Sequence, residues 1–165
     1  MDEGDLCQND EKAANFVIRK AGSYFMGRIL AIDYGTKRTG LAVTDPLQIV
    51  ANPLTTVPTK DIITFLTEYI KQEDVEAFVV GMPRDLFNND SHSTQAVKQF
   101  VALLKKKFAA YPVHLHDERF TSKMALDAMI RSGSSKSDRR KKENIDKLSA
   151  TIILQSYMEA ESYKK

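Results

Sequence analysis

Apolar and polar residues follow a regular pattern from Arg28 onward. Five short apolar runs are typical of strands, and they occupy residues 29–32, 41–44, 54–57, 77–80 and 113–116. Two of the intervening segments repeat apolar residues every three or four positions, as one face of a helix does: Ile62, Leu66, Tyr69 and Ile70 in the first, and Val97, Phe100, Val101, Leu104 and Phe108 in the second. The pattern predicts three strands, a helix, a strand, a helix and a fifth strand, in that order.

Turn and cap residues mark the ends of these elements. Thr59, directly after Pro58, is expected to be the N-cap of the first helix, and Gly81-Met82-Pro83 is expected to stop the fourth strand. Beyond the fifth strand, Thr121 or Ser122 is expected to cap a helix that ends at Ser132-Gly133. A last helix is expected over residues 144–162.

Hairpin strands followed by alternating strands and helices are typical of the α/β class. We expect a five-stranded mixed sheet with helices on both faces. Binding sites in such sheets lie at the carboxyl ends of the strands.

The whole chain narrows the class of protein further. Its 165 residues suit one domain, and its net charge of +2 gives no global basic signature. The single cysteine, Cys7, excludes an internal disulfide and a cysteine-cluster metal site, and it favours the cytoplasm. No apolar run approaches the roughly 18 residues of a membrane span.

Residues 1–25 show no core pattern, so we expect an N-terminal extension, disordered or not native, before a domain at residues 26–165.

Three acids stand where they can converge. Asp33 ends the first strand and Glu118 ends the fifth, while Asp146 shares a stripe of the last helix with apolar residues. Three carboxylates make a hard oxygen site of the kind that Mg²⁺ and Mn²⁺ prefer. The alternative is that each acid is a cap or surface residue, and that Asp146 pairs with Lys142, four residues earlier.

Basic residues near these acids can contact phosphates. Lys37 and Arg38 follow Gly35 in a turn, where the glycine either allows close approach of a phosphate or metal or simply forms a hairpin turn. A basic run at residues 136–142 includes Arg139, Arg140, Lys141 and Lys142, and a second run is Lys105–Lys107. The alternative for both runs is a solvated surface, and it is favoured for Lys105–Lys107, at the end of an amphipathic helix.

His114 and His116 lie on one face of the fifth strand, as two ligands of a zinc ion would. The chain has only one further histidine, His92, so a zinc site lacks ligands. We therefore expect exposed or packed histidines.

Four motifs carry a resemblance to a known family. They occur in order at residues 33–42 (DYGTKRTGLA), 81–83 (GMP), 117–122 (DERFTS) and 142–150 (KENIDKLSA). The series resembles the YqgF (RuvX-like) family, whose members are described as pre-16S rRNA nucleases and as Holliday-junction resolvase-like proteins. The resemblance covers essentially residues 26–165. Two departures are a methionine within Gly81-Met82-Pro83, where the family has leucine, and the absence of the usual acidic-glycine pair near Phe87-Asn88-Asn89.

The resemblance implies an RNase H-like fold with sheet order 3-2-1-4-5. It implies the carboxylate set Asp33, Glu118 and Asp146, the acids that the strand ends and the last helix also indicate as a divalent-metal site. Our mechanistic hypothesis adds Lys37, Arg38, Arg119 and Lys142 as candidates for holding phosphates or steadying the carboxylates. The resemblance also implies a cytoplasmic enzyme of ribosome biogenesis that matures the 5′ end of 16S rRNA, with pre-16S rRNA or a pre-ribosomal particle as its partner.

Three other functions remain open at this stage. The Asp33-x-Gly-Thr motif also resembles a phosphate loop of the actin, sugar-kinase and Hsp70 superfamily, although those proteins need a second such domain to close over ATP. A non-catalytic RNA-binding assembly factor could retain the same acids. A resolvase of DNA junctions would keep the chemistry but needs two paired sites, and the sequence fixes neither a monomer nor a homodimer.

Overall fold

A computed structural model describes residues 27–83, 92–118, 131, 133 and 142–162 of the chain, with the backbone alone for residues 92, 93, 118, 142 and 143. The five strands are β1 (Arg28–Tyr34), β2 (Arg38–Thr44), β3 (Ala51–Pro58), β4 (Val75–Pro83) and β5 (Val113–Glu118). The helices are η1 (Thr59–Asp61), α2 (Ile62–Gln72), α3 (His92–Lys107) and α6 (Lys142–Ser162). The expected helix between Thr121 and Ser132 falls outside the described residues, apart from the helical Arg131.

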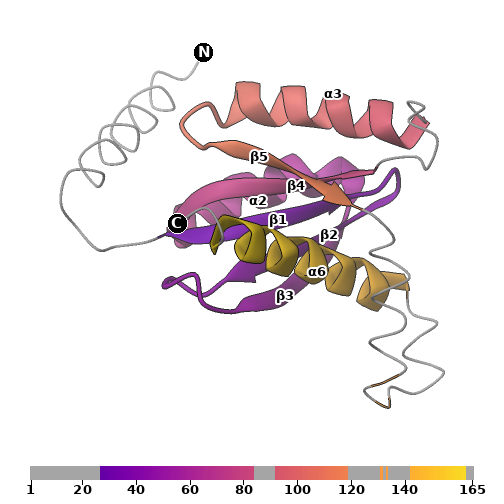
Figure 1. Cartoon of the computed structure of the whole chain (residues 1–165). Coiled ribbons are helices and arrows are strands. Elements are labelled where there is room, and N and C mark those ends of the chain that lie inside the picture. The colour runs from indigo at the N-terminus through magenta and orange to yellow at the C-terminus, as the bar shows by residue number, and fades with distance from the viewer. Residues whose placement is uncertain (1–26, 84–91, 119–130, 132, 134–141, 163–165) are drawn as a thin grey trace.

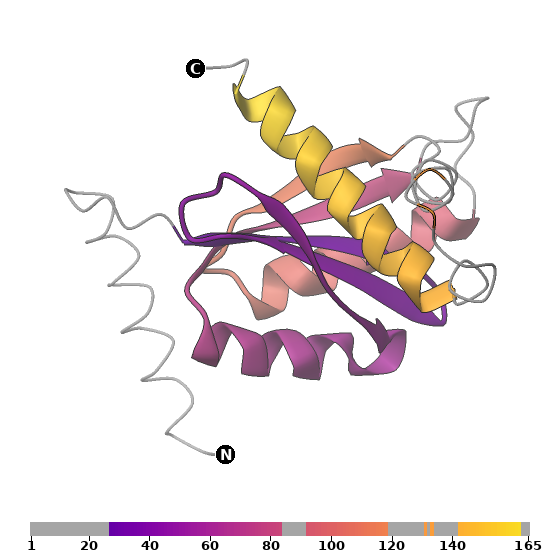
Figure 2. The same cartoon turned by 90° about the horizontal axis from the view of Figure 1, so that it is seen from below.

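The strands form one mixed sheet in the order β3-β2-β1-β4-β5, which confirms the expected α/β class and strand order. β1 pairs antiparallel with β2, and β2 with β3, whereas β1, β4 and β5 run parallel. The carboxyl ends of β1, β4 and β5 therefore meet at one edge of the sheet, where sites in such folds lie. Figure 2 shows α6 on one face of the sheet and α2 and α3 on the other.

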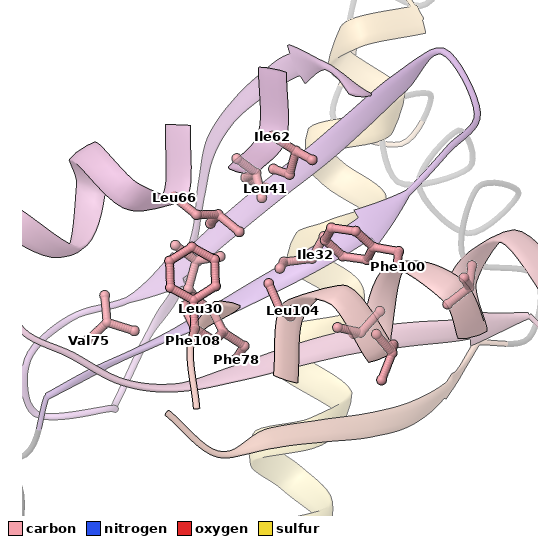
Figure 3. Packing of buried hydrophobic residues seen from close by; sticks show 13 residues of the cluster. Leu30, Ile32, Leu41, Ile62, Leu66, Val75, Phe78, Phe100, Leu104 and Phe108 are labelled. Atoms are coloured by element: carbon pink, nitrogen blue, oxygen red, sulfur yellow. The ribbon is translucent and has the colours of Figure 1, made fainter. Parts of the chain in front are cut away.

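The face covered by α2 and α3 holds the larger core. Alternating residues of the central strands point into it, and Figure 3 shows them packed against both helices. The fully buried members include Leu30, Ile32, Leu41, Leu66, Phe78 and Leu104. This packing confirms both helical stripes that the sequence predicts.

The other face is covered by α6, which lies across β1, β2 and β3 (Figure 1). Small residues of the strands, Ala31 and Ala42, face Ala150, Ile153 and Leu154 of the helix, and all five are buried. The small strand residues let the helix lie close to the sheet, so residues at its start are held near the strand ends.

Two of the expected turn and cap assignments are wrong. Gly81-Met82-Pro83 does not stop β4 but continues it, and these residues pair with His116, Asp117 and Glu118 of β5. A proline is tolerated there because it is the last residue of the strand.

Thr59 is also not the N-cap of the first long helix. It begins η1, and α2 then follows Asp61 without a side-chain cap. The hydroxyl of Thr59 instead donates to the carbonyl of Gly35 at 2.6 Å, and its backbone N–H donates to the carbonyl of Lys37 at 3.1 Å. Because that hydroxyl has only one proton, the buried Thr39 donates to it at 3.0 Å. Thr59 thus holds the β1–β2 turn in place.

Candidate active site

Asp33 is the next-to-last residue of β1, and its position faces α6. Alternation along β1 places residues 29, 31 and 33 on one face, and Ile29 and Ala31 belong to the core beneath α6. Across the ladder, Asp33 is the partner of Gly40 on β2. The candidate acid of the first strand therefore lies on the face that the last helix covers.

Gly40 lets α6 reach this face. A Cβ atom at Gly40 would collide with the backbone carbonyl of Asp146 and would lie 3.1 Å from the backbone nitrogen of Lys147. Only a residue without a side chain permits so close an approach of helix and strand. As a result, the backbone of Asp146 rests on the cross-strand neighbour of Asp33.

Arg38 holds the side chain of Asp146. Its Nε donates to Oδ2 of Asp146 at 3.3 Å, and the two side chains are 37% and 16% exposed. Arg38 lies two residues before Gly40, so it shares the face of β2 that α6 covers. The prediction that Asp146 points inward is confirmed. Its observed ion-pair partner is Arg38, whereas the sequence suggested Lys142, whose side chain is not among those described.

Glu118 is the last residue of β5, where its backbone pairs with Pro83. The parallel order β1-β4-β5 places it at the same edge of the sheet as Asp33. Among the side chains that the structure describes, no three of the types His, Cys, Asp and Glu form a metal-binding group. The third candidate ligand is not among those side chains, so its part in a metal site stays a prediction.

The basic candidates divide between the described and undescribed parts of the chain. Lys37 is exposed in the turn between β1 and β2. In that turn a Cβ at Gly35 would collide with the carbonyl of Arg38, so the close fit of the hairpin itself requires the glycine. Arg119, Arg139, Arg140 and Lys141 lie outside the described residues. Lys105–Lys107 are exposed at the end of α3.

The two histidines of β5 pack against α6, which confirms the expectation of packed or exposed histidines. The ring centroid of Tyr157 lies 5.5 Å from that of His114 and 6.1 Å from that of His116. Nε2 of His116 also lies 2.8 Å from the hydroxyl of Ser156. Through these contacts, His114 and His116 connect β5 to α6.

Burial lowers the pKa of His116 below its ordinary value, and the charge of Asp117 opposes this in part. The unfolded chain therefore takes up the proton first as pH falls. The contribution of neutral His116 to the free energy of unfolding is fully present above the pKa of the unfolded chain, about 6.5. This contribution is lost as pH falls from that value to the lower pKa of the folded protein. We expect the free energy of unfolding, measured in urea between pH 7.5 and 5, to fall with pH.

His116→Gln should reduce that slope. His114→Gln makes the same change two residues along the strand and should retain the part of the slope that His116 causes. An equal slope in wild type and His116→Gln contradicts the assignment.

Comparison with known proteins shows the family to which the chain is similar. The profile of the family described as "RuvX: Holliday junction resolvase" matches residues 27–160. A relative from Amoebophilus asiaticus is 56% identical over 140 residues, which are 85% of this chain and 98% of the relative. One from Phocaeicola vulgatus is 51% identical over 138 residues, 84% of this chain and 99% of the relative. Both are named "Putative pre-16S rRNA nuclease".

A solved structure has the same fold. It is described as "T. thermophilus RuvC in complex with Holliday junction substrate", and it superposes with a TM-score of 0.51 at 21% identity. The superposition covers 82% of this chain and 96% of that one.

The sheet order and the helices on both faces define an RNase H-like fold. With the matched profile and relatives, the assignment becomes specific: the chain belongs to the RuvX family. It is a nuclease, a hydrolase of phosphodiester bonds. Among the described residues, no helix is long and apolar enough to cross a membrane.

Proposed function

We propose that the protein is a divalent-metal-dependent nuclease that processes the 5′ end of pre-16S rRNA in the cytoplasm. The observation that carries the proposal is the seating of Asp146 on Gly40, because it brings an acid of α6 to the cross-strand neighbour of Asp33. The names of the relatives support the substrate. A pre-ribosomal particle is the partner that such a substrate implies.

The residues at this edge suit a hard cation. Asp33, Asp146 and Glu118 supply carboxylate oxygens, which Mg²⁺ and Mn²⁺ prefer. A bound divalent ion supplies a Lewis acid for the phosphate and an activated water. The chain itself fixes Asp146 through Gly40 and Arg38, and Thr59 holds the turn that carries the exposed Lys37. On this proposal, Lys37 binds a phosphate of the substrate.

A direct cleavage assay tests this function. We expect a labelled RNA that spans the 5′ end of 16S rRNA to be cut with Mn²⁺ or Mg²⁺, and to remain intact in EDTA. Full cleavage in the chelator contradicts the metal dependence. RNA binding without cleavage under any condition would make the protein an assembly factor.

A four-way DNA junction is the second substrate in the same assay, because the family profile is described as a Holliday junction resolvase. If the junction is cut and the RNA is not, the substrate is DNA and the proposed RNA substrate is wrong. A junction needs paired cuts, so sedimentation should then find a dimer.

The basic run at residues 136–142 should set affinity for nucleic acid. Binding through phosphates weakens by roughly 0.7 to 0.9 log units per contact for each tenfold rise in salt. We expect replacement of Arg139, Arg140 and Lys141 by alanine to flatten the salt dependence of RNA binding, measured by fluorescence anisotropy. An unchanged slope means that the run is solvated surface. Replacement of Lys105, Lys106 and Lys107 by alanine removes the same charge from the exposed end of α3 and is the matched comparison.

A further inference from the structure

The ion pair between Arg38 and Asp146 joins β2 to α6 across 108 residues of sequence. The side chain of Asp146 is only 16% exposed, and its carboxylate needs a counter-charge to stay ionised at low cost. Arg38 supplies that charge from the same face of the sheet. The position of Asp33 lies on the same face of the sheet.

A divalent ion bound by Asp146 would compete with Arg38. Both are cations, and like charges held near one carboxylate repel each other. Arg38 is 37% exposed and has a long, flexible side chain, so its guanidinium can leave the carboxylate and remain hydrated. A planar guanidinium is also well suited to binding phosphate through two hydrogen bonds.

We propose that Arg38 is the counter-cation of Asp146 until a divalent ion takes that carboxylate, and that its guanidinium then binds a phosphate of the nucleic acid. The inference rests on the proposed function, because it takes Asp146 as a metal ligand. Arg38 is thereby a positioning residue before the ion binds and a substrate contact afterwards. Metal binding and nucleic-acid binding become coupled through one side chain.

Titration of the full chain with Mn²⁺ alone tests the first half. Arg38→Gln should lower the melting temperature in EDTA, because Asp146 loses its counter-charge. The same variant should bind Mn²⁺ more tightly, by about 5-fold or more, because the competing cation is gone. If Arg38 only supports the fold, Arg38→Gln should be less stable than wild type but should bind Mn²⁺ no more tightly.

Lys60→Gln is the matched control. Lys60 is exposed in η1, and its replacement removes one positive charge from a residue outside the site. We expect its Mn²⁺ affinity and its melting temperature to equal those of wild type. Arg38→Lys keeps the charge and should restore the melting temperature in EDTA in part.

Binding of a labelled RNA with Mn²⁺ and with EDTA tests the second half, with the integrity of the RNA checked on a gel. Wild type should gain more RNA affinity from Mn²⁺ than Arg38→Gln does. If Mn²⁺ raises the RNA affinity of both proteins equally, the guanidinium of Arg38 does not bind a phosphate, and this half of the proposal is overturned.

The metal titration also separates this inference from the proposed function. If wild type cleaves RNA with Mn²⁺ but Arg38→Gln binds Mn²⁺ no more tightly, the counter-cation role alone is overturned. If wild type binds no Mn²⁺, the proposed function falls with it.

Discussion

Asp146→Asn should lower metal-dependent cleavage by more than about 100-fold. Loss of a residue that only supports a metal ligand already costs about 10- to 100-fold, and Asp146 is proposed as a direct ligand. Asparagine keeps the size of the side chain and removes the charge that a metal ligand supplies. The initial rate of RNA cleavage at saturating Mn²⁺ measures the loss. Asp61→Asn changes an exposed acid on η1 and should retain full activity.

The stability of Asp146→Asn in EDTA separates a ligand from a structural ion-pair partner. Loss of a buried structural pair costs about 3 to 5 kcal/mol. The pair with Arg38 is partly exposed, so its loss should cost about 0.2 to 1 kcal/mol, and relief of repulsion near Asp33 offsets part of that. We therefore expect the melting temperature to change by no more than about 4 °C. A fall of about 10 °C or more, which corresponds to the loss of a buried pair, would make Asp146 a structural residue.

Gly40→Ala should destabilise the protein by about 1 to 3 kcal/mol, as overpacking of a tight contact does, and Gly40→Val should cost more. The added Cβ meets the backbone of Asp146, which cannot turn aside as a flexible side chain could. Because α6 must shift to accommodate it, cleavage should fall as well. Urea unfolding and the cleavage assay measure the two effects.

Gly133→Ala is the comparison for this change. Gly133 has a φ of 76°, and a Cβ added there would meet no atom within 4 Å, so an alanine costs only backbone strain, about 1 to 2 kcal/mol. It should leave cleavage at the wild-type rate. If Gly40→Ala unfolds at the wild-type urea concentration, α6 does not approach β2 so closely at this glycine.

The strands and the two apolar helices could be predicted because their patterns are local. A buried strand such as β1 needs a continuous apolar run, and α3 needs a stripe of helical period, whatever lies elsewhere in the chain. Asp33 and Glu118 could be placed at one edge of the sheet for a related reason. Parallel strands that end in acids bring those acids to the same side.

The contacts that assemble the site could not be predicted in the same way. Arg38, which forms an ion pair with Asp146, lies 108 residues away in the sequence. The pairing with Lys142, one helical turn away, involves a side chain outside those described and stays a prediction. Gly40 gave the only local signal, since a glycine inside an apolar strand often marks a close backbone approach. Thr59 has good N-cap chemistry, but a tertiary bond to Gly35 takes its hydroxyl.

The order of the elements has a consequence for protein synthesis. α6 follows all five strands in the chain, yet it covers one face of the sheet and carries Asp146 to the neighbour of Asp33. A nascent chain that has emerged only through β5 therefore has an open sheet face and an incomplete set of acids. On the proposed function, the nascent chain therefore gains its cleavage activity only once α6 has left the exit tunnel.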